Sequence, residues 1–175
     1  GFMPIVVEVK SPADYDAWYD TPRGRWVGET EYALAARHLK TQPADSLLDV
    51  GCGTGWFTRR AAADDLRVTG LDPNSTWLDY ARAHSSPALT WVEGDARELP
   101  FADASFDHVL SIAALCFVDD ERRAVAESVR VARHDRIPCE KSRPEQGGAH
   151  LAHAAAHARD GLVAVDDQRL GVAAV

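Results

Sequence analysis

The sequence predicts an α/β fold with a Rossmann-like, mostly parallel sheet that is covered by helices on both faces. Three observations carry this prediction: strand-like and helix-like segments alternate between residues 44 and 133, a glycine-rich turn follows the first strand, and acidic residues end the next two. Parallel strands need long crossover connections, usually helices, so this alternation is typical of repeated βαβ units. A chain of 175 residues is long enough for one such domain.

The expected elements follow one another in a regular order. A helix is predicted first, over residues 29–40, because apolar residues recur there at the spacing of one helical face and Pro43 disfavours its continuation. Strands are then predicted at 46–50, 66–72, 89–95 and 106–115, and further helices at 56–65, 73–84 and 121–133.

Composition and charge narrow the class of protein. The net charge of −8, with histidines neutral, disfavours binding to nucleic acid or anionic lipid through a broad basic surface. No apolar run approaches the roughly 20 residues that span a bilayer, and the N-terminal residues do not resemble a secretory signal. The three cysteines form no CxxC pair. We therefore expect a cytoplasmic protein with no nucleic-acid partner and no membrane span.

The glycine loop is the strongest local signal. Gly51, Gly53 and Gly55 follow a predicted strand and precede a predicted helix, where a sharp turn or a close ligand favours glycine. The dinucleotide fingerprint needs a further glycine where Trp56 stands, so a nicotinamide-dependent oxidoreductase is disfavoured. A tight turn without a ligand remains the alternative.

Two acidic residues extend this signal. Asp72 ends the second predicted strand, where a carboxylate can accept hydrogen bonds from both ribose hydroxyls of a nucleoside. Asp95 ends the third, where it can accept from an adenine amino group. Either acid alone is explained as a helix cap or turn residue. Both together, beside a glycine loop, favour a nucleoside-binding site at the carboxyl ends of the strands.

The segments DVGCGTG, GLDPN, GDARELPF and FDHVLSIAAL resemble the successive motifs of class I S-adenosylmethionine-dependent methyltransferases. The resemblance covers residues 14–133 and is greatest to the small-molecule branch that includes ubiquinone and menaquinone methyltransferases. It implies S-adenosyl-L-methionine as cofactor and a small-molecule or lipid-like methyl acceptor. The cofactor-binding residues that it implies are Asp49, Gly51, Cys52, Gly53, Gly55, Asp72, Pro73, Asp95, Ala96 and Ser111.

The resemblance also implies a role for most of these residues. Asp49 would lie near the methionine amino group, the three glycines would line the methionine and ribose portion, and Ser111 would lie near the methionine part. Asp72 would take the ribose hydroxyls and Pro73 the adenine face. Asp95 would accept from the adenine amine, and the Ala96 backbone amide would donate to a ring nitrogen.

No catalytic residue can be assigned from the sequence. Methyl transfer from a sulfonium requires mainly alignment of donor and acceptor and exclusion of water. Residues expected on the substrate side are Tyr15, Trp18, Tyr19, Arg25, Cys116 and Phe117. The first three, together with Trp26, would form an aromatic lid with Arg25 as a clamp for the donor carboxylate. The alternative is an amphipathic segment packed on the sheet.

The C-terminal region departs from the family pattern. No aromatic residue follows Phe117, the expected Pro-Gly-Gly turn is absent, and only residues 162–165 look like a strand. We therefore divide the chain into an aromatic lid and helix (1–43), a cofactor-binding core (44–133) and an atypical or truncated Ala/His-rich tail (134–175).

This departure has two expected consequences. Without the family's last strands, the fourth strand becomes an exposed edge through which a homodimer can form. A cofactor-binding protein with impaired catalysis is the alternative to an active enzyme. His150, His153 and His157 share a helical face, but a solvated histidine-rich helix is favoured over a metal site, and no metal is expected.

Overall fold

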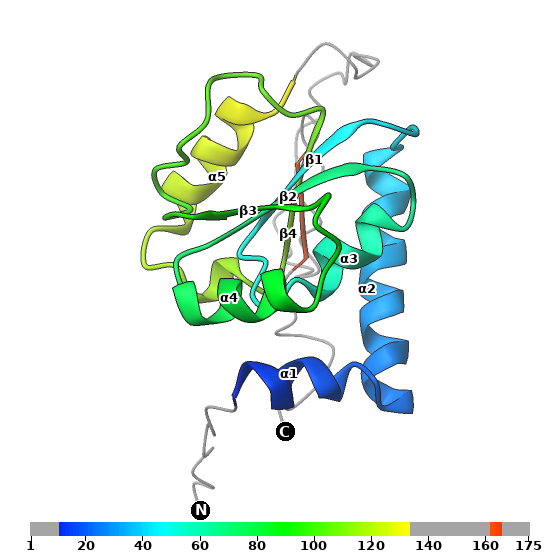
Figure 1. The fold of residues 1–175 in the computed structure, drawn as a ribbon. Coiled ribbons are helices and arrows are strands. Elements are labelled where there is room, and N and C mark those ends of the chain that lie inside the picture. Colours follow the sequence, from blue (N-terminus) through cyan, green and yellow to red (C-terminus); the bar gives the residue numbers. More distant parts are fainter. Residues whose placement is uncertain (1–10, 134–161, 166–175) are drawn as a thin grey trace, which may run out of the picture.

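Five parallel strands form a single sheet in the order β3-β2-β1-β4-β5 (Figure 1). The computed structural model describes residues 11–133 and 162–165. The strands are β1 (Ser46–Val50), β2 (Arg67–Asp72), β3 (Thr90–Glu93), β4 (His108–Ile112) and β5 (Leu162–Val165). The reversal of strand order at β1 and β4 creates the crevice where ligands of such sheets bind. The predicted fold class is confirmed.

Helices connect the strands and cover the sheet. They are α1 (Pro12–Trp18), α2 (Pro22–Leu39), α3 (Trp56–Ala62), α4 (Ser75–Ala83) and α5 (Glu121–Val131), with a 3-10 turn, η1 (Leu115–Phe117). α2 begins seven residues before the predicted helix at 29–40. Thr21 caps it by accepting a hydrogen bond from the Gly24 amide, and Pro22 occupies the first helical position, where no amide hydrogen is needed. A Ser-Pro pair starts α1 in the same way.

The core has two halves, one on each face of the sheet. Leu47 and Leu48 are both fully buried, and their alternation along β1 sends them to opposite faces. Leu47 joins a cluster with residues of α2 and α3, whereas Leu48 joins one that includes Val131 of α5. Figure 1 shows α2 and α3 on one side of the sheet and α5 on the other. Both faces of β1 and β4 are therefore covered.

The expectation that the fourth strand is an exposed edge is wrong. β5 pairs with β4 in parallel register, with Val109 opposite Leu162 and Ile112 opposite Val165. This pairing confirms the strand predicted at 162–165 and satisfies the backbone groups of β4 that an edge would leave open. The expected homodimer was based on that edge and stays untested. Residues 134–161 and 166–175 of the proposed tail, including the three histidines, lie outside the described residues.

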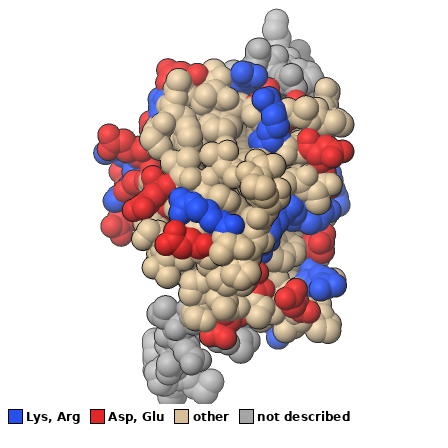
Figure 2. Space-filling view, in the orientation of Figure 1, with Lys and Arg blue, Asp and Glu red and all other residues tan. Residues whose placement is uncertain are grey.

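Among the described residues, no helix is both long enough and apolar enough to cross a membrane. On the face drawn in Figure 2, acidic and basic side chains are interspersed around a largely uncharged centre.

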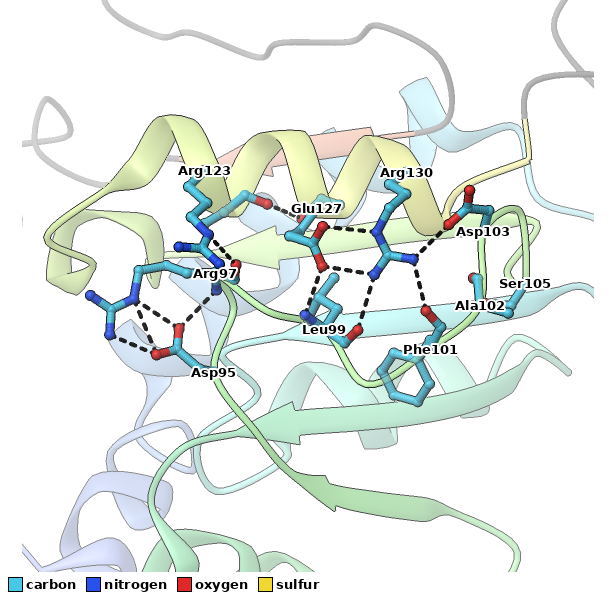
Figure 3. Close-up of polar contacts among 12 residues, drawn as sticks. Asp95, Arg97, Leu99, Phe101, Ala102, Asp103, Ser105, Arg123, Glu127 and Arg130 are labelled. Atoms are coloured by element: carbon cyan, nitrogen blue, oxygen red, sulfur yellow. Dashed lines mark hydrogen bonds and ion pairs between the residues drawn. The ribbon is translucent and has the colours of Figure 1, made fainter.

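Arg130 of helix α5 makes several contacts to the loop between β3 and β4. The Arg130 guanidinium donates to the backbone oxygens of Leu99 (3.0 Å) and Phe101 (2.8 Å), and to the carboxylates of Asp103 (2.8 Å) and Glu127 (2.7 Å) (Figure 3). The Glu127 carboxylate also accepts from the Leu99 amide at 2.9 Å. These contacts fix the loop that begins at the end of β3.

We expect Arg130→Ala to lower the free energy of unfolding by about 1–2 kcal/mol, because two loop carbonyls and the Glu127 carboxylate lose a charged donor. Urea unfolding followed by circular dichroism measures the change. The control is Arg122→Ala, an exposed position on the same helix, which should stay within about 0.5 kcal/mol of the parent. Equal effects of the two substitutions would contradict the bracing role of Arg130.

Candidate active site

The glycine loop between β1 and α3 turns through left-handed backbone. Gly51 has φ of 78° and Gly55 has φ of 81°, a region that side chains rarely adopt. A Cβ atom on Gly55 would overlap the Trp91 ring, and one on Gly51 would overlap the Cβ of Ala114. The amides of Gly51 and Cys52 both donate to the Leu71 carbonyl, at 2.8 and 3.0 Å, and so tie the loop to β2. Glycine is thus required here by packing and by the turn itself.

The Asp72 carboxylate lies where β2 ends and links two loops. One carboxylate oxygen accepts from the Gly53 amide at 2.9 Å, and the other accepts from the Asn74 amide at 2.9 Å. A carboxylate offers about four acceptor positions, so about two remain open toward the cavity. The side chain is therefore oriented before any ligand arrives.

Asp95 follows β3 and pairs with Arg97. The Arg97 guanidinium contacts both carboxylate oxygens, with its shortest distance 2.6 Å, and the Arg97 amide donates to the same carboxylate at 2.8 Å. The hydrogen bonds from Arg97 lower the pKa of Asp95 to about 2. Asp95 is consequently ionised at neutral pH although its side chain is 46% exposed.

Asp49 is the buried acid of the site. It lies on β1, is 2% exposed, and accepts a hydrogen bond from Thr58 Oγ1 of α3 at 2.6 Å. Burial raises its pKa to about 7, and the nearby charge of Asp72 acts in the same direction, whereas the Thr58 hydrogen bond opposes it. The burial that raises the pKa of Asp49 also raises that of the Cys52 thiol, which keeps the thiol protonated.

Aromatic residues from three helices cover one end of the site. Tyr19 stacks on Trp56 with ring centres 4.6 Å apart, and Tyr15 meets Trp77 edge-on at 5.0 Å. α1 is held over α3 by an ion pair at 2.7 Å between Asp16 and Arg59. The same guanidinium donates to the Thr54 carbonyl in the glycine loop at 2.7 Å. Tyr15 and Tyr19 thus lie at one end of the site, and their role as an aromatic lid stays a prediction.

These features surround one cavity of about 1080 Å³, the size of a cofactor-binding cleft. Most of the predicted site residues line it: Tyr15, Tyr19, Gly51, Cys52, Gly53, Asp72, Pro73, Asp95, Ala96, Ser111, Cys116 and Phe117. Asp49 and Gly55 lie directly behind the lining, one on β1 and one at the start of α3.

Two predicted substrate-side residues are placed elsewhere. Trp18 packs against Tyr19 with ring centres 5.0 Å apart and contributes to the core on the α2 side. Arg25 lies on α2 beside a second, shallower groove and pairs with Asp20 at 3.7 Å. Trp26, which was also expected in the lid, lines the same groove and is exposed. Both residues lie on α2, whose start at Pro22 the sequence prediction missed.

The opposite end of the cavity is formed by the segment after β4. Ser111 is buried and donates to the Val50 carbonyl at 3.0 Å. Ala113 then adopts a φ of 53°, which turns the chain into η1 and places Cys116 and Phe117 at the cavity rim. The Phe117 side chain is 86% exposed.

Several lining residues were not predicted. Thr54 is 1% exposed, and its Oγ1 has no hydrogen-bond partner within the described part of the chain. Trp77 and Arg97 also line the cavity. Thr54 stands inside the glycine motif and could have been chosen on that ground, but nothing in the local sequence indicates that Trp77 of α4 reaches Tyr15. Within 11–133 and β5, no three metal-ligating side chains gather as a metal site would require.

A family model described as a methyltransferase domain matches residues 48–136, about half of the chain. The chain belongs to this methyltransferase family. The match begins on β1 and includes the glycine loop, Asp72, Asp95 and η1.

Similar proteins carry related names. A malonyl-[acyl-carrier protein] O-methyltransferase of Hahella chejuensis is 38% identical over 122 residues, which cover 67% of this chain and 42% of that protein. The chain spans less than half the length of the curated relatives it matches.

Solved structures show the same fold. The YcgJ protein of Bacillus subtilis aligns with a TM-score of 0.57 and 25% identity, covering 61% of this methyltransferase-family chain and 47% of that one. The [4+2]-cyclase SpnF aligns with a TM-score of 0.55 and 28% identity, covering 58% and 40% of the two chains.

The raised pKa of Asp49 makes a prediction about stability. Folding disfavours the ionised form, so the free energy of unfolding should fall by a few kcal/mol as pH rises from about 4, the pKa of a free Asp, to about 7, the pKa in the folded protein. Asp49→Asn keeps an oxygen for the Thr58 hydroxyl and removes this loss. Urea unfolding at pH 4.5 to 8 compares the two proteins. The prediction fails if both lose stability equally over that range.

Proposed function

We propose that this chain binds S-adenosyl-L-methionine in the cavity and catalyses transfer of its methyl group to a small-molecule or lipid-like acceptor. One observation carries the proposal: the glycine loop, Asp72 and Asp95, which end three successive strands, line a single cavity. Membership of the methyltransferase family supports it.

The polar groups of the cavity suit the nucleoside half of this cofactor. The open acceptor positions of Asp72 would receive the two ribose hydroxyls. Asp95 would accept from the adenine amine, the Ala96 amide would donate to a ring nitrogen, and exposed Pro73 would lie against the adenine face. We infer these roles from two sources: the positions of the residues in the cavity, and the resemblance of their motifs to those of class I methyltransferases.

The methionine half would lie between Asp49, the glycine loop and Ser111. The Asp49 carboxylate would favour the ammonium group. The Thr54 hydroxyl, which has no partner among the described residues, offers a hydrogen bond to a polar group of the ligand. Tyr15 and Tyr19 would cover this end and exclude water, and their rings can attract a sulfonium through cation–π contact.

When bound, the cofactor supplies an activated methyl group on a positively charged sulfur. The chain contributes alignment of the acceptor and a water-poor cavity, which are the main requirements of such a displacement. Among the lining residues that the structure describes, the segment after β4 supplies the thiol of Cys116 and the carboxylate of Asp119, and substitution of either tests for a base.

The wall formed by Ile112, Leu115, Phe117 and Val118 supports an apolar acceptor. Burying Phe117 under an acceptor would remove a large exposed apolar surface from water. The name of the Hahella relative is consistent with an acyl acceptor, and the sequence motifs are consistent with a quinone precursor. We propose this broad apolar class rather than either compound.

Calorimetric titration with S-adenosylhomocysteine tests cofactor binding. We expect micromolar affinity for the parent chain and at least about tenfold weaker binding for Asp72→Ala, which removes the acceptors for the ribose hydroxyls. The control is Asp79→Ala, whose exposed carboxylate on α4 lies outside the cavity lining. Absence of binding to the folded parent chain would refute the proposal. Binding without methyl transfer to any acceptor tested would favour a cofactor-binding protein with impaired catalysis.

The affinity for S-adenosylhomocysteine should also depend on pH through Asp49. The ligand ammonium favours ionised Asp49, and below pH 7 the buried carboxyl must first lose a proton. Binding should therefore strengthen as pH rises from about 6 to 8, and this dependence should disappear in Asp49→Asn. The same titrations, repeated across this pH range, measure it. An unchanged slope in the variant would show that Asp49 does not face the ammonium.

A further inference from the structure

We propose that Arg97 is a positioning residue that orients the Asp95 carboxylate toward the donor's 6-amino group and thereby makes the site selective for adenine over a 6-oxo purine. The inference rests on the proposed function, since it assumes that the purine lies against Asp95. It adds a residue that the sequence motifs did not assign.

The hydrogen bonds around Asp95 leave one direction open. Three donors of Arg97 reach the carboxylate: the amide at 2.8 Å, Nε at 3.0 and 3.1 Å, and a terminal guanidinium nitrogen at 2.6 Å. A carboxylate has about four acceptor positions. Nε is shared between the two oxygens, so three N–H donors fill about three of these positions and about one remains for a single N–H of an adenine amine.

Arg97 is itself fixed by contacts with Arg123 and Asp119. Its carbonyl oxygen accepts a hydrogen bond from Arg123 Nε of α5 at 2.8 Å (Figure 3). Its second terminal nitrogen lies 3.9 Å from the Asp119 carboxylate, which follows η1 and lines the same cavity. The guanidinium is planar and its donors keep a fixed spacing, so the bidentate contact fixes the carboxylate plane.

The open position can only accept a hydrogen bond, because Asp95 is ionised. A 6-amino group can donate to it. A 6-oxo group would instead place an acceptor oxygen against the carboxylate, leaving both groups without a donor. Selectivity thus depends on two conditions that Arg97 supplies: the orientation of Asp95 and the persistence of its charge.

The experiment compares two ligands that differ only at this position, S-adenosylhomocysteine and S-inosylhomocysteine, by calorimetric titration. We expect the parent chain to prefer the adenine ligand by about 10- to 100-fold. Arg97→Ala should reduce this preference about tenfold, mainly by weakening the binding of the adenine ligand. Arg97→Lys should reduce the preference less, because lysine keeps the positive charge but lacks the planar, bidentate donors of the guanidinium. The control, Arg82→Ala, removes a similarly exposed arginine that pairs with Asp79 and should leave the preference unchanged.

A double-mutant cycle separates positioning from a general structural role. If Arg97 acts through Asp95, then Arg97→Ala should not change the preference further in an Asp95→Ala background. Circular dichroism confirms that each variant is folded. An equal loss of both ligands in Arg97→Ala, with the preference intact, would overturn the inference while leaving the proposed function in place. If neither ligand bound the folded parent chain, that result would refute both the proposed function and this inference.

The pH dependence of the ratio of the two affinities reports on the ionisation of Asp95. Any effect of Asp49 on binding is common to both ligands and cancels in the ratio. The charged groups that face the Asp95–Arg97 pair are Arg123 of α5 and Asp119 and Asp120 of the preceding segment. In the parent chain the ratio should stay constant from pH 7 to 3.5. In Arg97→Ala it should fall about threefold at the acid end, because Asp95 regains the pKa of an ordinary carboxyl, about 3.9. A constant ratio in both proteins would contradict the role of Arg97 in keeping Asp95 ionised.

Discussion

The Asp72 carboxylate accepts hydrogen bonds from two loops that are separated in the sequence, the glycine loop after β1 and the turn after β2. Parallel pairing brings the ends of these strands together, with Val50 opposite Leu71, so the two loops start side by side. Without this carboxylate the amide of half-buried Gly53 would lose its hydrogen-bond partner, and the amide of exposed Asn74 would bond to solvent instead. One carboxylate satisfies both and still keeps acceptor positions for a ligand, and the shape of the nucleoside end depends on it.

Contacts from α5 hold the β3–β4 loop, which forms the Asp95 side of the cavity. Glu127 and Arg130 of α5 bind the backbone of the β3–β4 loop, and Arg123 binds the carbonyl of Arg97. These side chains do not line the cavity, yet they fix the residues that do. The position of Asp95 therefore depends on α5, a helix that begins more than twenty residues later in the sequence.

The elements that the sequence predicted are those encoded locally. The glycine loop, Asp72 and Asp95 were recognisable because each follows a short apolar segment, and strand ends of a parallel sheet share one edge. Contacts between distant segments were not predictable in this way. The Arg97–Arg123 contact, the approach of Trp77 to Tyr15 and the pairing of β5 with β4 depend on how elements pack. The start of α2 was missed for a different reason: the aromatic pattern of residues 14–26 concealed the Thr21–Pro22 signal.

Helix α1 has a consequence for how a ligand enters and leaves. None of its seven residues is fully buried, although Trp18 packs against the core on the α2 side. Its attachment depends on this packing, on the Asp16–Arg59 pair and on the ring contact between Tyr15 and Trp77. Such an element opens at a small fraction of the free energy of global unfolding. Exchange of ligand can thus proceed by local opening of α1, while Arg59, which also holds the Thr54 carbonyl, keeps the glycine loop in place.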